Sequence, residues 1–556
     1  MRVADYIAEF IHKQGVRNVF LLSGTGSIHL DDAFAFQSGM KYITARHEGA
    51  AVVMAEAAAK LSDGIGVVVT TTGPGGTNAF SGIVEAWVDS TPVFVISGQV
   101  SAREIVPELR SFGIQGFNII DQVQRITKYA VLVTDPLSIR FHLEKALHLA
   151  LTGRRGPVWL DIPSDVQAQE IDRDSLEGYI PNPAPAGDSD WKTLLDSAIE
   201  SLMSAKRPLI VVGQGVRQAN AIPEFQKIVD LLGIPVVSSR LGQDILPDDH
   251  PLYFNQGGLM GHRHTFGMMT NCDLVLSFGS SLSQAFTGNN ASYFSPDTQF
   301  IMVDIDPSEI GKLGNRVKHS IVHDVKEVFQ YLAVQTAGRD LPRWADWVVR
   351  CKRHKTSRPV ILPTDRKDPI NSYCFLERLD AASDSHHIFV SDAGGTYYIA
   401  GQGLKFNRGQ REVTSGAFAS MGMTLPLAIG AAATVPDAQI LALTGDGSIE
   451  LNIQELRTIS QYDLNIKVFV INNGGYASIR ASQDASCGGR YTDEQKVLNF
   501  KKVADAFELP FHMLEHFDTL DTDIPLVLAM PGPALIEVVC DSKQKMVKFE
   551  REDMPL

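Results

Sequence analysis

Two apolar runs in the C-terminal third of the chain end in small polar residues that could bind a metal ion. The first, ILALTGDG, covers 440–447, and the second, IKVFVINNGG, covers 466–475. If both runs are strands of one parallel sheet, Asp446 and Asn473 lie at its carboxyl edge, where such sheets bind ligands. Their side-chain oxygens and the carbonyl of Gly475 suit Mg²⁺, which also takes phosphate oxygens. The pattern predicts a site for magnesium and a phosphorylated ligand.

The glycines and serine around Asp446 predict how the phosphate would be held. Gly445 ends the first run, and Gly447 and Ser448 lead into a helix-like segment, so their backbone N–H groups could face an anion. A lone GDG or a lone NNGG is a common turn or loop. The two motifs together, 27 residues apart and each after an apolar run, are much more specific.

Apolar, β-rich runs alternate with helical patterns in three separate blocks, and these elements must position the candidate site. Continuous apolar strands alternating with helices predict an α/β fold of three doubly wound parallel sheets. Polar, proline-containing linkers at 178–190 and 353–369 separate the blocks. We therefore expect three domains, at 1–175, 190–335 and 370–545.

Composition excludes several classes of protein. The 556 residues are 44% hydrophobic and 21% charged, with a net charge of −14, which disfavours a nucleic-acid or anionic-membrane binder. The N-terminal sequence has no apolar stretch behind a basic start, and the five scattered cysteines form no CxxC pair. We expect a cytoplasmic enzyme without a disulfide framework or a membrane span.

The GDG…NN pair resembles the motif of thiamin diphosphate (ThDP)-dependent enzymes. The resemblance implies that Asp446, Asn473 and the Gly475 carbonyl hold Mg²⁺ on the cofactor's diphosphate. SDAGGTYY (391–398) resembles the loop whose amides hold that diphosphate. Further cofactor contacts implied by the resemblance are Gly395 and Thr396 in this loop, and Met421, which would prop the cofactor into its bent shape.

ThDP enzymes also need a glutamate on the cofactor's aminopyrimidine ring. In TARHEGAAVVMAEAAAK (44–60), Glu48 follows a predicted strand and opens a helix, and the resemblance makes it the catalytic residue. Taken alone, it would be an ordinary helix-start carboxylate favoured by the helix dipole. Gln115, within SFGIQGFNIID (111–121), aligns with a glutamine that lines the active site of acetohydroxyacid (acetolactate) synthases.

Two longer stretches, 71–100 and 414–432, also resemble acetohydroxyacid synthases, and the resemblance covers nearly the whole chain in the order pyrimidine-binding, central and diphosphate-binding domain. Those synthases carry FAD, which does no net redox work, in the central domain. The arginine-rich RFDDR segment of the synthases is replaced here by SSLSQAFTG (280–288). The positions that match flavin contacts are Gly213, Gly215, Gly261, Gly279 and Asp304.

The resemblance implies a carboligase that decarboxylates a 2-oxo acid, most simply pyruvate, and transfers the two-carbon unit to a carbonyl acceptor. YASIRASQ (476–483) lacks the tryptophan that favours 2-ketobutyrate in the synthases, and Arg480 could bind an acid or phosphate group of the acceptor. The segment resembles flavin-containing carboligases that extend nucleotide-linked ketosugars. Acetolactate synthesis from a second pyruvate, simple decarboxylation and a non-catalytic scaffold stay open. We expect at least a homodimer, and a tetramer is compatible with the resemblance.

Overall fold

The computed structural model describes residues 1–181, 190–489 and 496–553, so residues 182–189 of the first predicted linker lie outside the described part. Within that part the chain forms three six-stranded sheets, and all paired neighbouring strands are parallel. Each sheet lies inside one of the three predicted blocks. The predicted α/β class, with three parallel sheets covered by helices, is confirmed.

The N-terminal sheet has the strand order β2-β1-β3-β4-β6-β5. Its strands are β1 (Asn18–Leu21), β2 (Lys41–Thr44), β3 (Gly66–Thr70), β4 (Val93–Gln99), β5 (Tyr129–Leu132) and β6 (Val158–Pro163). Its helices are α1 (Val3–Lys13), α2 (Ile28–Phe36), α3 (Glu48–Ser62), α4 (Pro74–Asn78), α5 (Phe80–Val88), α6 (Ile119–Val123), α7 (Ile139–Leu151) and α8 (Ser164–Ala168). Strands β3, β4 and β6 are buried along their whole length, as expected for central strands of a covered sheet.

The central sheet has the order β12-β11-β10-β7-β8-β9. Its strands are β7 (Pro208–Val212), β8 (Val236–Ser238), β9 (Tyr253–Gln256), β10 (Leu274–Phe278), β11 (Gln299–Asp304) and β12 (Val317–Val322). Its helices are α9 (Trp191–Ser204), α10 (Gly215–Gln218), α11 (Ile222–Leu232), α12 (Arg263–Asn271), α13 (Gln284–Thr287), α14 (Pro307–Gly311), α15 (Val325–Thr336) and α16 (Ala345–Thr356). Trp347 and Cys351 of α16 pack in the central core, so this domain extends beyond residue 335.

The C-terminal sheet has the order β14-β13-β15-β16-β18-β17. Its strands are β13 (His387–Ser391), β14 (Arg411–Thr414), β15 (Gln439–Gly445), β16 (Ile466–Asn472), β17 (Phe511–Leu514) and β18 (Ala534–Val539). Its helices are α17 (Ser372–Ala382), α18 (Gly394–Gly403), α19 (Thr424–Thr434), α20 (Glu455–Gln461), α21 (Ala477–Ser486), α22 (Phe500–Ala506) and α23 (Leu520–Leu528). Strands β15 and β16, which carry the two motifs, are adjacent.

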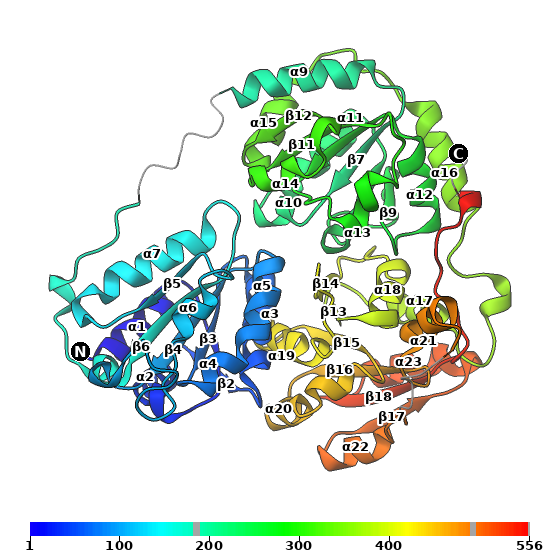
Figure 1. Ribbon diagram of the computed structural model, residues 1–556. Helices are drawn as coiled ribbons and strands as arrows, with labels where there is room; N and C mark the ends of the chain where they lie inside the picture. Colours follow the sequence, from blue (N-terminus) through cyan, green and yellow to red (C-terminus); the bar gives the residue numbers. More distant parts are fainter. Residues whose placement is uncertain (182–189, 490–495, 554–556) are drawn as a thin grey trace.

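Helices α3 and α19 join the N-terminal and C-terminal domains and lie side by side between the two sheets (Figure 1). The His47 side chain caps α3 by accepting the N–H of Gly49 at 3.1 Å. A methyl group on Gly430 of α19 would lie 2.1 Å from the carbonyl oxygen of Met54, so only glycine permits this close helix crossing. The small residues of α3 therefore allow the two domains to share one apolar core.

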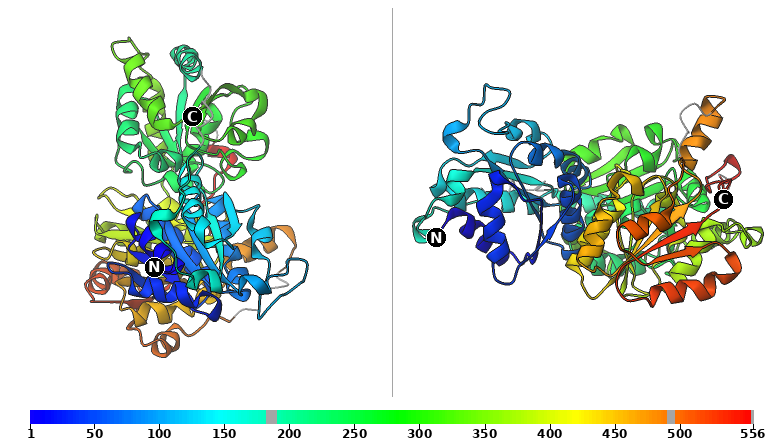
Figure 2. Two further views of the ribbon diagram at one scale, coloured as in Figure 1. Left: turned by 90° about the vertical axis from the view of Figure 1, so that its left-hand side faces the viewer. Right: turned by 90° about the horizontal axis from the view of Figure 1, so that it is seen from below.

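The central domain lies on one side of the layer that the other two domains form (Figures 1 and 2). A C-terminal segment returns to it from the C-terminal sheet. Phe549 stacks on Phe266 with ring centroids 3.8 Å apart, and the Asp553 carboxylate pairs with Arg263 and Arg358. No helix in the described part of the chain is long and apolar enough to cross a membrane.

Candidate active site

The carboxyl ends of β15 and β16 meet the first turn of α18, and this junction brings several predicted cofactor residues together. Parallel pairing places Gly445 opposite Ile471, so Asp446 and Asn473 follow on adjacent strands. A methyl group on Gly395 would lie 4.0 Å from the Asn473 Nδ2 atom, and one on Gly445 would lie 3.5 Å from the Thr396 Oγ1 atom. The residues predicted from three separate sequence segments therefore line one small region.

Asp446 is the centre of this region and is 3% exposed. Its Oδ1 atom accepts the N–H of Gly447 at 2.9 Å, and its Oδ2 atom accepts those of Asn473 at 3.1 Å and Gly475 at 2.7 Å. Burial raises the pKa of Asp446, although these hydrogen bonds oppose the shift. Among the described residues, no Lys, Arg or His side chain forms an ion pair with this carboxylate. A buried anion without a protein counter-charge fits a bound cation.

The donor set at Asp446 agrees with a hard metal ion held partly by a ligand. The described residues contain no cluster of three His, Cys, Asp or Glu side chains that could hold a metal alone. Gly475, at φ +103°, turns the loop back, and its carbonyl accepts the N–H of Ala477 at 2.8 Å. One lone pair on that carbonyl is left for a further partner. The site thus offers one carboxylate, one amide side chain and one carbonyl, and it needs ligand oxygens to complete an octahedron.

Asp392 is a fully buried carboxylate that the sequence analysis did not single out. It accepts the Ser448 hydroxyl at 2.6 Å and the N–H groups of Gly422 at 3.0 Å and Thr424 at 3.3 Å. Asp392 therefore ties the turn after β15 to the start of α19 and fixes the position of Met421, which is half-buried. Its position directly after a strand, in SDAGG, is the signal that could have identified it.

Arg480, predicted as an acceptor-binding residue, points back to the loop that precedes it. Its guanidinium donates to the carbonyl oxygens of Gly474 at 2.6 Å and Asn473 at 3.1 Å. These contacts brace the loop that carries the predicted metal ligands. Arg480 therefore supports the loop at 473–475, and its role toward a substrate stays a prediction.

Glu48 begins α3 in the N-terminal domain and is 5% exposed. The Asn78 side chain donates to its Oε2 atom at 3.0 Å, and a methyl group on Gly75 would lie 3.6 Å from its Oε1 atom. Gln115 lies on the other side of the same turn, because a Cβ atom on Gly73 would be 2.0 Å from the Gln115 carbonyl oxygen. The structure thus places both predicted catalytic residues around one turn.

Among the described residues of one chain, no hydrogen bond joins Glu48 to the Asp446 region. Glu48 binds a residue of its own domain, whereas the partners of Asp446 are backbone groups of the C-terminal domain. Gln115, with φ +65°, is exposed. The arrangement is compatible with the expected homodimer, in which a second subunit could complete the site, and this assembly stays a prediction.

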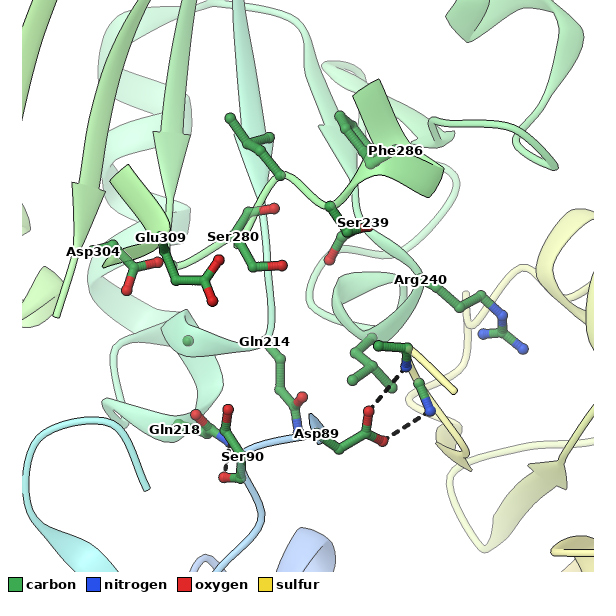
Figure 3. A pocket seen from close by; sticks show the side chains of 18 of the residues that line it. Asp89, Ser90, Gln214, Gln218, Ser239, Arg240, Ser280, Phe286, Asp304 and Glu309 are labelled. Carbon is green, nitrogen blue, oxygen red and sulfur yellow. Dashed lines mark hydrogen bonds between the residues drawn. The ribbon is translucent and has the colours of Figure 1, made fainter. Parts of the chain in front are cut away.

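A cavity of about 770 Å³ lies where the three domains meet, with walls formed by all of them (Figure 3). Three of the predicted flavin positions line it, namely Gly215, Gly279 and Asp304. Gly213 and Gly261 are not among the lining residues. A methyl group on Gly213 would lie 2.3 Å from the Gly279 carbonyl oxygen, so that glycine permits close backbone packing beside the cavity.

The charged residues around the cavity are largely paired with one another. Arg154 forms ion pairs with Asp306, at 3.0 Å, and with Glu309, and the buried Arg240 is bound by Glu412. Burial raises the pKa of Asp304 to about 6. Segment 280–288 contributes hydroxyl and amide groups and no arginine. The volume is within the range of protein cofactor sites, and Asp304 and the backbone near Gly215 and Gly279 fit a nucleotide group.

Comparison with known proteins identifies the family. Three regions match thiamine pyrophosphate enzyme families: the N-terminal TPP binding domain over residues 1–124, the central domain over 195–332 and the C-terminal TPP binding domain over 392–538. The chain is 29% identical to a probable acetolactate synthase large subunit of Methanocaldococcus jannaschii, over 98% of this chain and 93% of the relative.

Two further relatives resemble this chain over most of their length. The acetolactate synthase isozyme 3 large subunit of Escherichia coli is 30% identical, over 91% of this chain and 88% of the relative. The acetolactate synthase large subunit of Corynebacterium glutamicum is 31% identical, over 89% of this chain and 78% of the relative. Together with three parallel sheets and the junction around Asp446, these matches show that the chain belongs to the acetolactate synthase-like family of ThDP-dependent enzymes.

Proposed function

We propose that this protein is a ThDP- and Mg²⁺-dependent carboligase that decarboxylates pyruvate and transfers the two-carbon unit to a second molecule of pyruvate, as the names of its relatives suggest. One observation carries the cofactor part of this proposal. Asp446 is a buried carboxylate, held in place by three backbone N–H groups and next to Asn473. Such a group has an obvious use as a ligand of the cation that neutralises a diphosphate.

The residues of the C-terminal domain would bind the metal ion and the cofactor's diphosphate. Asp446, the Asn473 side chain and the Gly475 carbonyl would hold Mg²⁺, and the backbone near Gly395 and Thr396 would face the diphosphate. Bound ThDP would supply the carbon nucleophile and the electron sink that decarboxylation needs.

In the N-terminal domain, Glu48 would share a proton with the aminopyrimidine ring, and the Asn78 amide would keep the carboxylate oriented by donating to Oε2. Met421 would support the bent cofactor from the side of α19. Gln115 would contact the substrate.

The acceptor is the part of the proposal that the residues constrain least. The segment after Asn473 lacks tryptophan, which favours an acceptor other than 2-ketobutyrate and keeps a nucleotide-linked ketosugar as a second candidate. Incubation of the protein, ThDP and Mg²⁺ with labelled pyruvate, alone and with each acceptor, separates the possibilities. Acetolactate from pyruvate alone is the expected product.

Other products of that experiment would point elsewhere. A branched sugar formed in preference to acetolactate would assign the second candidate, and free acetaldehyde as the only product would indicate a simple decarboxylase. A protein that binds ThDP but consumes no pyruvate with any acceptor would refute the carboligase proposal and leave a non-catalytic role.

We further propose that the cavity between the domains holds FAD, with Gly215, Gly279 and Asp304 contacting the nucleotide. The basis is the cavity's size and the family, in which the flavin does no net redox work. Purified protein should release flavin on denaturation, or gain the flavin absorbance band and a higher unfolding temperature when FAD is added. A colourless protein that does neither would contradict this part alone.

We also propose that the active unit is at least a homodimer in which Glu48 of one subunit and Asp446 of the other serve one cofactor. Support comes from the described part of one chain, in which Glu48 is bound by Asn78 of its own domain and forms no hydrogen bond with Asp446 or with the residues that donate to Asp446. Light scattering should give a mass of at least two chains, and a catalytically active monomer would exclude this assembly.

A further inference from the structure

Asp89 lies directly after α5, where the N-terminal domain meets the C-terminal domain, and is 4% exposed. Its two oxygens accept two consecutive backbone N–H groups from the other domain. The Gly416 amide donates to Oδ2 at 2.8 Å, and the Ala417 amide donates to Oδ1 at 2.9 Å. One carboxylate therefore fixes both the position and the orientation of the backbone that follows β14.

The neighbouring side chains hold the same stretch of backbone. The buried Lys60 ammonium pairs with Asp89 at 2.8 Å and donates to the Thr414 carbonyl oxygen at 2.9 Å. Glu85, one turn earlier on α5, accepts the hydroxyl of Ser420 at 2.8 Å and also that of Ser415. Residues 414–420, here named the clamped segment, are thus held by three charged side chains of the N-terminal domain.

The clamped segment connects the cavity with the predicted cofactor site. Residues 416–419 form part of the cavity wall, and dashed lines in Figure 3 mark the hydrogen bonds that Asp89 accepts there. At its other end the segment leads directly into Met421 and Gly422. The Gly422 N–H binds both Asp392, at 3.0 Å, and the Ser448 hydroxyl, at 2.8 Å. A shift of the clamped segment would therefore move Met421 relative to the turn that carries Asp446.

We propose that Asp89 is a positioning residue for the cofactor: by binding two successive amides of the clamped segment, it sets the position of Met421, the residue expected to support the bent cofactor. This inference rests on the proposed ThDP-dependent function. Asp89 itself touches the C-terminal domain's backbone and acts on the cofactor through it. The arrangement needs two acceptor atoms at one position, which a carboxylate provides.

The geometry predicts why the isosteric amide would not replace Asp89. Asparagine offers one acceptor oxygen, so either the Gly416 or the Ala417 N–H would face an NH₂ group. The charge that pairs with Lys60 would be lost as well. Ser420→Ala is a milder change, because Ser420 is partly exposed and gives up one hydrogen bond to Glu85 without altering any charge.

The experiment measures ThDP binding by calorimetry in excess Mg²⁺, and hydrogen exchange of the peptide covering the clamped segment in the cofactor-free protein. We expect D89N to raise the Kd for ThDP about tenfold or more, S420A to raise it about threefold, and both to speed exchange in that peptide. Asp174→Asn, an exposed change in the same domain, is the matched control and should stay within twofold of the parent on both measurements.

Each outcome decides the proposal. If Asp89 served stability alone, D89N would lower the unfolding temperature while the folded protein bound ThDP as the parent does, and this result would overturn the inference. The inference would also be overturned if both S420A and D89N showed the parent's exchange rate and ThDP affinity. If D89N does not fold, the result for S420A alone tests the inference. A parent protein that fails to bind ThDP would instead refute the proposed function. The exchange measurement would still test whether Asp89 and Glu85 hold the clamped segment in place.

Discussion

Replacement of Asp446 by asparagine is the sharpest test of the cofactor site, because it removes one charge and one acceptor atom while keeping the shape. In the parent, one oxygen of Asp446 serves the Gly447 N–H and the other serves the Asn473 and Gly475 N–H groups. The amide has a single oxygen, so at least one of these buried donors must face an NH₂ group.

The expected loss of ThDP affinity follows from the number of N–H groups that lose their acceptor. A buried donor that loses its acceptor costs about 1–3 kcal/mol. The free variant can relieve this cost by distorting the turn, and ThDP binding must restore the undistorted turn. Since about 1.4 kcal/mol corresponds to a factor of ten, this restoration alone would weaken ThDP binding roughly 5- to 150-fold. Loss of the anionic ligand for Mg²⁺ adds to this cost. We therefore expect the Kd for ThDP to rise on the order of 100-fold or more.

Calorimetric titration with ThDP at several Mg²⁺ concentrations measures this change. The affinity of the parent should rise with Mg²⁺ and fall on acidification, because burial raises the pKa of Asp446 and the ion needs the ionised carboxylate. Asp437→Asn, an exposed change just before the opposite end of β15, should behave as the parent. If D446N binds ThDP within threefold of the parent and with the same Mg²⁺ dependence, the assignment of this site is wrong.

Three further predictions concern catalysis, assembly and the buried charges. Glu48→Gln should bind ThDP within about threefold of the parent but lose about 10²- to 10⁴-fold in pyruvate consumption; a fully active variant would remove Glu48 from the mechanism. Co-assembled E48Q and D446N subunits should recover about half the parental activity per hybrid dimer, because one site carries both changes and the other neither; verified hybrids without activity would place both residues in one subunit's site. Lys60→Met should destabilise the apoprotein by about 3–5 kcal/mol, since it leaves the buried Glu56 and Asp89 without their ion-pair partner. Burial raises the pKa of Glu56 to about 7, so its protonation on acidification removes buried charge and the deficit in unfolding temperature should shrink from pH 8 to pH 5.5; a constant deficit would contradict this electrostatic explanation.

The sequence by itself determined the alternation of strands and helices, and it identified the ends of the two strands that carry the candidate cofactor site. Apolar runs alternating with helices predicted three parallel sheets, because strands buried on both faces need apolar side chains throughout. The polar residues at which two of these runs stop placed Asp446 and Asn473 at one sheet edge, and in the structure they directly follow two adjacent strands. These inferences succeeded because each depends on local pattern and on the parallel geometry that the pattern imposes.

Tertiary structure alone decided which side chains support those residues. Asp89 meets the amides of Gly416 and Ala417 across more than 320 positions, and nothing in the local sequence around α5 announces that contact. Arg480 turns back onto the carbonyls of its own loop, although its residue type equally suited a substrate anion. A buried polar group must find a partner wherever the packed chain brings one, so its role follows from the arrangement of whole domains rather than from spacing along the sequence.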